Sequence, residues 1–200
     1  MEKLKIFLDC DDTLIDSSEC IIEILNSKYG LNKKIDDLKD FEFKSIYKEM
    51  NSDKVFDLFE SDDFWNSIKV KDGFNIDYFK RKNLKPVVVS CGTKKNLKKK
   101  QKFIEDNFGF KFMGLEFTPE NFSLNKSGIN MAGGIQIDDN YSSLEGTNAA
   151  IKILIQNNRR FEWSIPKAGE DNLYVVQDWN DIYKILDFVI KYPEFIERCY

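Results

Sequence analysis

Histidine is absent from this 200-residue chain, and its absence removes whole classes of chemistry. Serine–histidine and cysteine–histidine catalysis both need an imidazole base, and many zinc sites use histidine ligands. The four cysteines, Cys10, Cys20, Cys91 and Cys199, show no spacing typical of metal ligands, so we interpret them as free thiols in a reducing cytoplasm. Acid–base chemistry in this chain must therefore depend on carboxylates, lysine, tyrosine or cysteine.

The chain also lacks the apolar run of about 18 residues that a membrane-spanning helix requires. Its first residues, MEKLKIFLDCDD, reach acidic positions too soon for a signal peptide. With 30 basic and 34 acidic residues, the net charge of −4 is too small for a nucleic-acid coat or an acidic disordered tail. We therefore expect a cytoplasmic protein with no membrane partner and no nucleic-acid partner.

Seventeen phenylalanines and a hydrophobic share of 42% are enough to build the core of one domain. Short apolar runs that end at polar residues predict strands at residues 4–8, 86–90, 113–117, 134–137, 151–155 and 173–176. Apolar residues at helical spacing predict helices at residues 17–29, 94–107 and 182–190. This alternation predicts an α/β fold, with a Rossmann-like, mostly parallel sheet sandwiched by helices.

One stretch of the chain does not follow this alternation. Residues 18–72 contain no convincing strand pattern after the first helix and are rich in aromatic residues, which predicts two or three short helices. We interpret this stretch as a small helical cap inserted after the first strand, with residues 1–17 and 73–200 forming the α/β core. Aromatic rings of a cap can stack on a substrate, although such rings more often build the cap's own core.

Three acidic residues, Asp9, Asp11 and Asp12, follow directly after the first predicted strand. A helix cap or a turn explains one aspartate well and three poorly. Three carboxylates this close repel one another unless a cation neutralises them. If the strand stays extended, the side chains of Asp9 and Asp11 share one face.

Functional groups also follow later strands, and ligands of parallel sheets lie beyond the carboxyl ends of the strands. Ser90 ends the second strand just before a helix, where its hydroxyl and free backbone N–H groups make an anion site. Asp138 and Asp139 end another strand, and paired acids suit a hard cation such as Mg²⁺. Lys126 precedes that strand, and taken alone it is no more than a surface lysine.

Residues 80–102 contain ten basic residues and no acidic one. We interpret the lysine-rich run from residue 94 to 102 as the solvated face of a helix. The alternative is an electropositive flank that attracts an anionic substrate.

Taken in order, these groups resemble the motifs of the haloacid dehalogenase superfamily of phosphotransferases. The match consists of D-x-D-x-T (Asp9, Asp11, Thr13), Ser90, Lys126 and the pair Asp138–Asp139. The resemblance implies a Mg²⁺-dependent phosphatase with an HAD-like core. Asp9 would be the nucleophile that forms an aspartyl-phosphate, and Asp11 the general acid and base.

The resemblance also implies the remaining site residues. Mg²⁺ would be held by Asp9, the backbone carbonyl of Asp11, and Asp138 and Asp139, with Asp139 favoured as the direct ligand of the pair. The substrate would be bound by Thr13, Ser90, Cys91, Gly92, Lys126, Phe64 and Trp65, of which Ser90 and Lys126 hold the phosphoryl oxygens.

Within the superfamily, the chain is most similar to the 5′(3′)-deoxyribonucleotidase (cytosolic type C 5′-nucleotidase) family. The features that carry this similarity are Phe64–Trp65, residues 118–126, the NNRRFEW stretch at residues 157–163, and Asp178–Trp179. The chain departs from the pattern at Asp12, where many relatives have glycine, and at Cys91–Gly92, where a second hydroxyl and a proline are usual.

This family resemblance implies a small-molecule phosphate ester as the partner, in the first place a nucleoside monophosphate, and it leaves a homodimer open. Three alternatives remain: a general sugar-phosphate phosphatase, a polynucleotide 3′-phosphatase, and a non-catalytic binding protein that uses the same fold. The last of these would be expected to have lost Asp9, Asp11 or the aspartate pair, and all are present.

Overall fold

The computed structural model describes residues 4–117, 126–159, 161–167 and 172–198. Its centre is a parallel sheet with the strand order β3-β2-β1-β4-β5-β6. The strands are β1 (Lys5–Leu8), β2 (Val87–Gly92), β3 (Lys111–Glu116), β4 (Gly134–Asp138), β5 (Ile151–Ile155) and β6 (Leu173–Val176). This sheet confirms the predicted Rossmann-like α/β fold.

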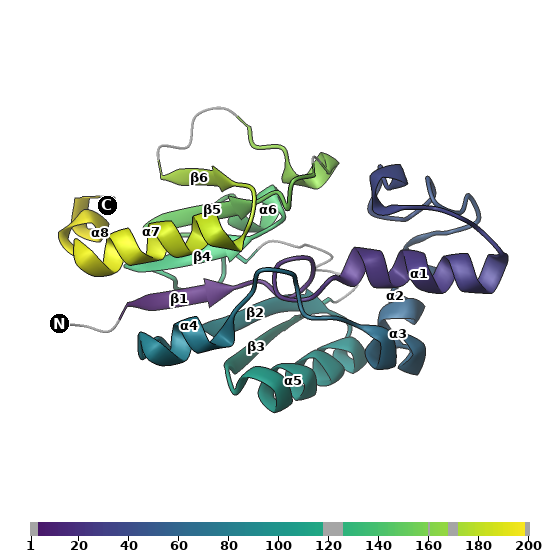
Figure 1. Ribbon diagram of the computed structural model, residues 1–200, viewed down its shortest axis with the longest axis horizontal. Coiled ribbons are helices and arrows are strands. Elements are labelled where there is room, and N and C mark those ends of the chain that lie inside the picture. Colours follow the sequence, from purple (N-terminus) through teal and green to yellow (C-terminus); the bar gives the residue numbers. More distant parts are fainter. Residues whose placement is uncertain (1–3, 118–125, 160, 168–171, 199–200) are drawn as a thin grey trace.

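The strand order reverses between β1 and β4. The chain runs outward from β1 through β2 to β3 and then returns to place β4 on the other side of β1. Crevices at the carboxyl ends of strands beside such a reversal are where open α/β sheets bind ligands. Figure 1 shows these carboxyl ends directed toward α1 (Ser17–Tyr29), while β1 begins at the opposite end of the molecule.

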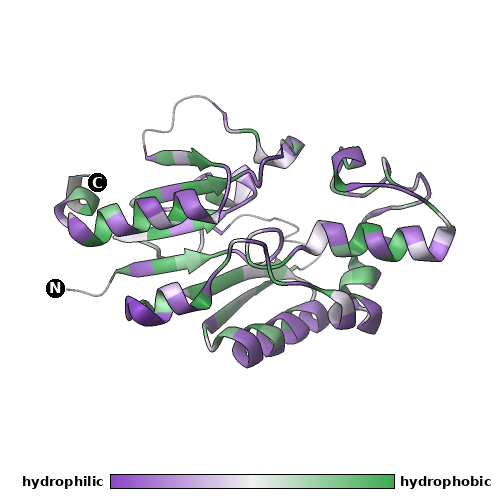
Figure 2. Ribbon diagram, viewed as in Figure 1, coloured by the Kyte–Doolittle hydropathy of each residue, from purple (hydrophilic) through white to green (hydrophobic). Residues whose placement is uncertain are grey.

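Most helices of the core pack on one face of the sheet, and one short helix packs on the other. The core helices are α4 (Ile76–Arg81), α5 (Lys94–Phe108), α6 (Tyr141–Leu144), α7 (Trp179–Lys191) and α8 (Glu194–Arg198). Ile6 and Leu8 of β1 pack into the main cluster with residues of α4, α5 and α7, whereas Phe7 packs on the other face with Met131. Figure 2 shows the resulting hydrophobic strands between helices whose outer faces are hydrophilic.

Between β1 and β2 the chain forms a second hydrophobic cluster of its own. Residues 18–72, here called the insertion, contain most of α1, a 3-10 turn at Ile35–Asp37, α2 (Ser52–Glu60) and α3 (Asp62–Ser67). The two segments that connect it to the sheet lie side by side, because Ile15 and Val70 form an antiparallel bridge. The buried ion pair between Lys71 and Asp16, at 2.6 Å, joins the same two segments.

The element boundaries agree with the predicted strands to within two residues at each end. Three short helices were not predicted: α4, α6 and α8. Of these, α4 begins after Asn75, whose side chain accepts a hydrogen bond from the Asp77 N–H. Its six residues make too short a segment for helical periodicity to be visible, because its buried residues Tyr78 and Phe79 are adjacent. Among the residues that the structure describes, every helix is too short or too polar to cross a bilayer.

Candidate active site

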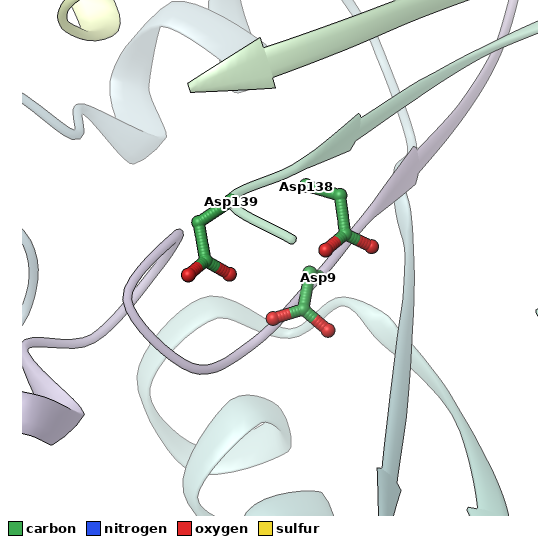
Figure 3. Close-up of side chains that lie close together, drawn as sticks. All are labelled: Asp9, Asp138 and Asp139. Atoms are coloured by element: carbon green, nitrogen blue, oxygen red, sulfur yellow. The ribbon is translucent and has the colours of Figure 1, made fainter. Parts of the chain in front are cut away.

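The carboxylates of Asp9, Asp138 and Asp139 converge at the carboxyl ends of β1 and β4 (Figure 3). The strand register explains the meeting, because Leu8 pairs with Ile137 and the Asp9 N–H donates to the Ile137 carbonyl at 2.9 Å. One oxygen of each carboxylate lies within 4.8 Å of the others, and all three residues are buried. The sequence placed each of these residues at the end of a predicted strand, and the family resemblance implied that they share one site.

Lys126 lies between two of these carboxylates and is only 2% exposed. Its ammonium group donates to Asp138 at 2.7 Å and also to Asp9. Burial raises the pKa of Asp9 to about 7, although Lys126 opposes the shift. Burial by itself would lower the pKa of Lys126, but Asp138 and Asp9 outweigh it, so that pKa is raised and the side chain stays charged. Lys126, which its sequence surroundings did not distinguish from a surface lysine, is therefore a central member of the site.

Asp139 has a different partner, the indole of Trp163. The indole N–H donates to an oxygen of Asp139 at 2.9 Å. Burial raises the pKa of Asp139 well above its usual value, and the charges of Asp12 and Asp9 add to the shift, while the indole hydrogen bond opposes it. The cluster therefore holds more negative charge than its one lysine neutralises.

This donor set fits Mg²⁺. Three buried carboxylate oxygens are the hard ligands that Mg²⁺ prefers, and a divalent cation would offset the repulsion that raises the pKa values of Asp9 and Asp139. Both members of the aspartate pair contribute an oxygen to the cluster. The choice between Asp138 and Asp139 as direct ligand therefore stays a prediction.

The carboxylate of Asp11 points elsewhere, because the condition for sharing a face with Asp9, an extended strand through both residues, is not met. The strand ends at Leu8, and the chain then turns, with the Leu14 N–H donating to the Cys10 carbonyl at 2.9 Å. The Asp11 side chain is 27% exposed, accepts a hydrogen bond from Ser17 Oγ at 2.7 Å, and pairs with Lys100. Asp11 thus stands beside the carboxylate cluster and not inside it.

Lys100 is a site residue that the sequence reasoning missed. It is 2% exposed, and its ammonium group donates to Ser90 Oγ at 2.8 Å and to the Cys91 carbonyl at 3.1 Å, in addition to pairing with Asp11. The signal was present in the sequence: Leu97, Lys100 and Ile104 recur at helical spacing, which places the lysine in the buried row of α5. The solvated-face interpretation holds for most of this lysine run and fails for Lys100.

The two buried lysines approach the strand ends from opposite faces of the sheet. Val88 and Val89 belong to opposite faces of β2, so Ser90 points to the side covered by α5, which carries Lys100. Asp9 follows Leu8 and lies on the face where Lys126 packs. The alternation of side chains along the strands therefore places the Lys126–Asp9 pair on one side of the sheet and Lys100, which pairs with Asp11, on the other.

Asp12 explains one of the departures from the family pattern. Its φ of 49° lies in the left-handed region that glycine adopts most readily, so glycine at this position is expected in relatives. The Asp12 carboxylate is buried and accepts hydrogen bonds from the backbone N–H of Ser18, at 3.0 Å, and from its hydroxyl. These bonds tie the loop after β1 to the first turn of α1.

A cavity of about 90 Å³ lies above these groups. Its floor consists of the carboxylates, the two lysines and the Ser90–Gly92 segment, and Cys91 and Gly92 are both on the lining as the sequence suggested. Its outer wall is aromatic, formed by Phe41, Phe43, Phe56, Phe59, Phe117 and Trp163. Burial raises the pKa of the Cys91 thiol to about 11, so this cysteine is protonated and unsuited to be a nucleophile.

Three residues predicted to bind substrate do not line this cavity. Phe64 is fully buried in the core of the insertion, where its ring lies 5.1 Å from that of Phe59. The Trp65 indole donates to the Phe59 carbonyl at 2.7 Å and packs against the hydrophobic cores. Thr13 is fully buried, and its hydroxyl has no hydrogen-bond partner among the described residues. Packing of the insertion, which sequence spacing does not reveal, decided which rings reach the cavity.

Some of the residues that carry the family resemblance lie outside the described residues. Residues 118–125, which precede Lys126, lie outside the described residues, as does residue 160 of the NNRRFEW stretch. The described part of that stretch runs between β5 and β6 and brings Trp163 to the cavity.

Comparison with known proteins gives a structural match without a sequence match. No family model and no curated protein match the chain by sequence. A solved structure of a predicted phosphatase from Clostridium acetobutylicum superposes with a TM-score of 0.59 at 18% identity, over 92% of this chain and 99% of that one. An HAD-family hydrolase from Deinococcus radiodurans, solved with bound phosphate and sodium, superposes with a TM-score of 0.60 at 11% identity, over 93% and 96%.

A haloacid dehalogenase-like protein of unknown function from Agrobacterium tumefaciens gives a TM-score of 0.56 at 13% identity, over 94% of this chain and 99% of that one. These matches span nearly the whole of each chain and share the class that the sequence motifs suggested. The chain therefore has the haloacid dehalogenase-like fold. The narrower similarity to deoxyribonucleotidases stays a prediction.

Proposed function

We propose that this chain is a Mg²⁺-dependent phosphatase that hydrolyses phosphate monoesters through an aspartyl-phosphate on Asp9. The observation that carries the proposal is the buried cluster of Asp9, Asp138 and Asp139, with Lys126 held between two of them at the carboxyl ends of β1 and β4. A phosphate monoester is a dianion, so an attacking carboxylate needs compensating positive charge around it. Bound Mg²⁺ would supply part of that charge, and the two buried lysines supply the rest.

The residues of the chain divide the work as follows. A carboxylate oxygen of Asp9 forms a bond to phosphorus while the ester P–O bond breaks, and Asp11 gives its proton to the leaving oxygen. A water molecule then attacks the aspartyl-phosphate and passes its proton to Asp11, which releases phosphate and restores both aspartates. Lys126 and Ser90 hold the phosphoryl oxygens, and Lys100 holds Asp11 beside Ser90.

For the organic part of the substrate, a nucleoside monophosphate is our first candidate. It is supported by the aromatic outer wall, because bases stack on aromatic rings whereas the hydroxyls of a sugar need polar partners. The rings involved differ from the predicted pair, since Phe56, Phe59 and Trp163 line the cavity in place of Phe64 and Trp65. The reduced thiols of Cys10 and Cys20 suit a cytoplasmic setting for this activity.

The second candidate is a phosphatase of small sugar or acid phosphates, and the size of the cavity favours it. A volume of about 90 Å³ is well below the roughly 300–1,000 Å³ of typical ligand pockets. A nucleotide would therefore require the insertion to move away from the strand ends, as caps and lids of enzymes do. A small ester would require less movement.

A panel of phosphate esters tests both levels of the proposal. Nucleoside 5′- and 3′-monophosphates, sugar phosphates and phosphoglycolate are each incubated with the protein and Mg²⁺, and released phosphate is measured, with Asp9→Asn as the inactive control. We expect Mg²⁺-dependent release from at least one ester, fastest from a nucleotide. A preference for a sugar or acid phosphate over every nucleotide would assign the second candidate, and no release from any ester would contradict the phosphatase itself.

A further inference from the structure

The NNRRFEW stretch identified in the sequence belongs to a loop that the proposed chemistry does not use. Residues 156–159 and 161–164 form the first part of the connection from β5 to β6, here called the 156–164 loop, and a hydrogen bond from the Gln156 side chain to the Ser164 carbonyl at 2.9 Å closes its base. The Asn157 amide donates to the Asp12 carbonyl at 2.8 Å, in the loop that follows β1. The 156–164 loop is thus closed at its base and hydrogen-bonded to the loop that follows β1.

The same loop also packs into the insertion. Phe161 is 6% exposed and belongs to the hydrophobic cluster of the insertion, although it is part of the core chain. Arg159 forms an ion pair with Glu19 in the first turn of α1. The 156–164 loop therefore contacts three parts of the molecule: the sheet, the loop that follows β1, and the insertion.

Trp163 occupies the point where these contacts meet the cavity. Its ring stacks on Phe161, with centroids 4.5 Å apart and planes 14° from parallel, and it meets Phe41 of the insertion edge-on at 6.3 Å. Its indole N–H donates to one oxygen of Asp139 at 2.9 Å. The stacking with Phe161 and the edge contact with Phe41 restrict rotation of the indole away from Asp139.

We propose that Trp163 is a positioning residue for the metal site and at the same time part of the wall that faces the substrate. This inference rests on the proposed function. The indole holds one oxygen of Asp139, and the same carboxylate presents an oxygen to Asp9 and Asp138, so this hydrogen bond fixes the orientation of the Asp139 carboxylate in the cluster. Hydrogen bonds that orient a metal-binding side chain typically change metal affinity by about 10- to 100-fold.

The two roles belong to different atoms of one side chain, so two substitutions separate them. Trp163→Phe keeps an aromatic ring and removes the N–H, and we expect it to weaken Mg²⁺ binding about tenfold while KM for the best ester changes little at saturating Mg²⁺. Trp163→Ala removes both, and we expect it to raise KM as well. Mg²⁺ affinity is measured by calorimetry on the metal-free protein, independently of turnover.

Trp65→Phe is the matched control. It removes an indole N–H whose acceptor is the Phe59 carbonyl within the insertion, away from the carboxylates, so Mg²⁺ affinity is expected to equal that of the unsubstituted protein. A double-mutant cycle tests directly whether Trp163 acts through Asp139. In an Asp139→Asn background, Trp163→Phe should cause little further loss of Mg²⁺ affinity, because the carboxylate through which it acts is gone.

The outcomes distinguish this inference from the function on which it rests. If the unsubstituted protein binds Mg²⁺ and hydrolyses an ester while Trp163→Phe binds Mg²⁺ with unchanged affinity, the positioning role is overturned and the phosphatase stands. If the unsubstituted protein neither binds Mg²⁺ nor hydrolyses any ester, the proposed function itself fails.

A measurement on the unsubstituted protein decides the case in which Trp163→Phe does not fold. The chain has three tryptophans, and their indole N–H resonances are followed by NMR during a Mg²⁺ titration. We expect one indole resonance, not that of Trp65, to shift in step with Mg²⁺ binding. Binding of Mg²⁺ without movement of any indole resonance would overturn the inference.

Discussion

The floor and the outer wall of the cavity are built in different ways. The floor is ionic and lies at strand ends, where hydrogen bonds of the sheet fix Asp9 and Asp138 side by side. The wall is aromatic and comes from scattered segments: turns of the insertion, α2, the residue after β3, and the 156–164 loop. Function needs the floor to be rigid, whereas the wall must admit a substrate.

The floor and the wall also differ in how they affect the stability of the fold. The floor concentrates buried charge, which raises the pKa of Asp9 and Asp139 and makes the site dependent on Lys126 and a cation. The wall buries apolar surface and contributes to stability through ordinary packing. Substitutions on the floor should therefore affect chemistry and charge balance, and substitutions on the wall should affect substrate choice.

The largest effect is expected at Asp9. Asp9→Asn should lower kcat for the best ester by roughly 10³-fold or more, because the amide cannot form the covalent intermediate. The variant should remain folded and, without metal, be at least as stable as the unsubstituted protein, since one of three buried carboxylates has lost its charge. Phosphate release and urea unfolding check the two halves, and activity within tenfold of the unsubstituted protein would refute the mechanism.

The two lysines provide a comparison within the floor. In EDTA, Lys126→Met should lower the free energy of unfolding by about 3–5 kcal/mol, because it removes the buried positive charge that pairs with Asp9 and Asp138. Lys100→Met should cost roughly 1–2 kcal/mol, because Asp11 is 27% exposed and water can solvate it. Urea unfolding measures both, and Mg²⁺ should recover part of the Lys126→Met loss. Equal losses in the two variants would contradict this account.

On the wall, Phe56 and Phe64 form a matched pair from neighbouring helices. Phe56 lines the cavity, so Phe56→Ala should lower kcat/KM for a nucleotide about tenfold, the equivalent of one lost base–ring contact, and leave a small aliphatic ester nearly unaffected. Phe64 is fully buried, so Phe64→Ala should cost about 3–5 kcal/mol of stability without changing the preference between the two esters. If both variants changed the preference between the nucleotide and the small ester equally, Phe56 would not be the ring that contacts the base.

The smallest effect concerns pH and metal together. In the folded state Asp9 holds its proton until a pH of about 7, whereas an unfolded aspartate releases it near 3.8, so its contribution to stability is lost as the pH rises between these values. Lys126 stays charged over the whole range and adds no slope. In EDTA the melting temperature should fall by roughly a few degrees from pH 5 to pH 8.

Mg²⁺ should reverse this slope, since it binds the deprotonated carboxylates and stabilises the native state that binds it. The gain in melting temperature on adding Mg²⁺ should accordingly be larger at pH 8 than at pH 5. An equal gain at both pH values would mean that Asp9 does not contribute to the metal site.

The residues that the sequence placed well share one property: they lie at or near the carboxyl ends of strands. A parallel sheet brings these ends to one edge, and the strand order β2-β1-β4 then makes the strands of Asp9, Ser90 and Asp138 neighbours. Lys126 precedes β4, and the family pattern rather than its spacing identified it. Lys100 was recognisable from its place in the buried row of α5, but a run of lysines around it concealed the signal.

The sequence by itself determined the strands and their polar ends, and with them the fold class and the candidate acidic residues, because a short apolar run that ends at polar residues is a local property of the chain. Only the tertiary structure decided which aromatic rings face the cavity, that Phe64 and Trp65 do not, and that Trp163 meets Asp139 across 24 positions of sequence. Apolar side chains have no directional requirement that the sequence could record. Their partners are chosen by how the insertion and the 156–164 loop pack together.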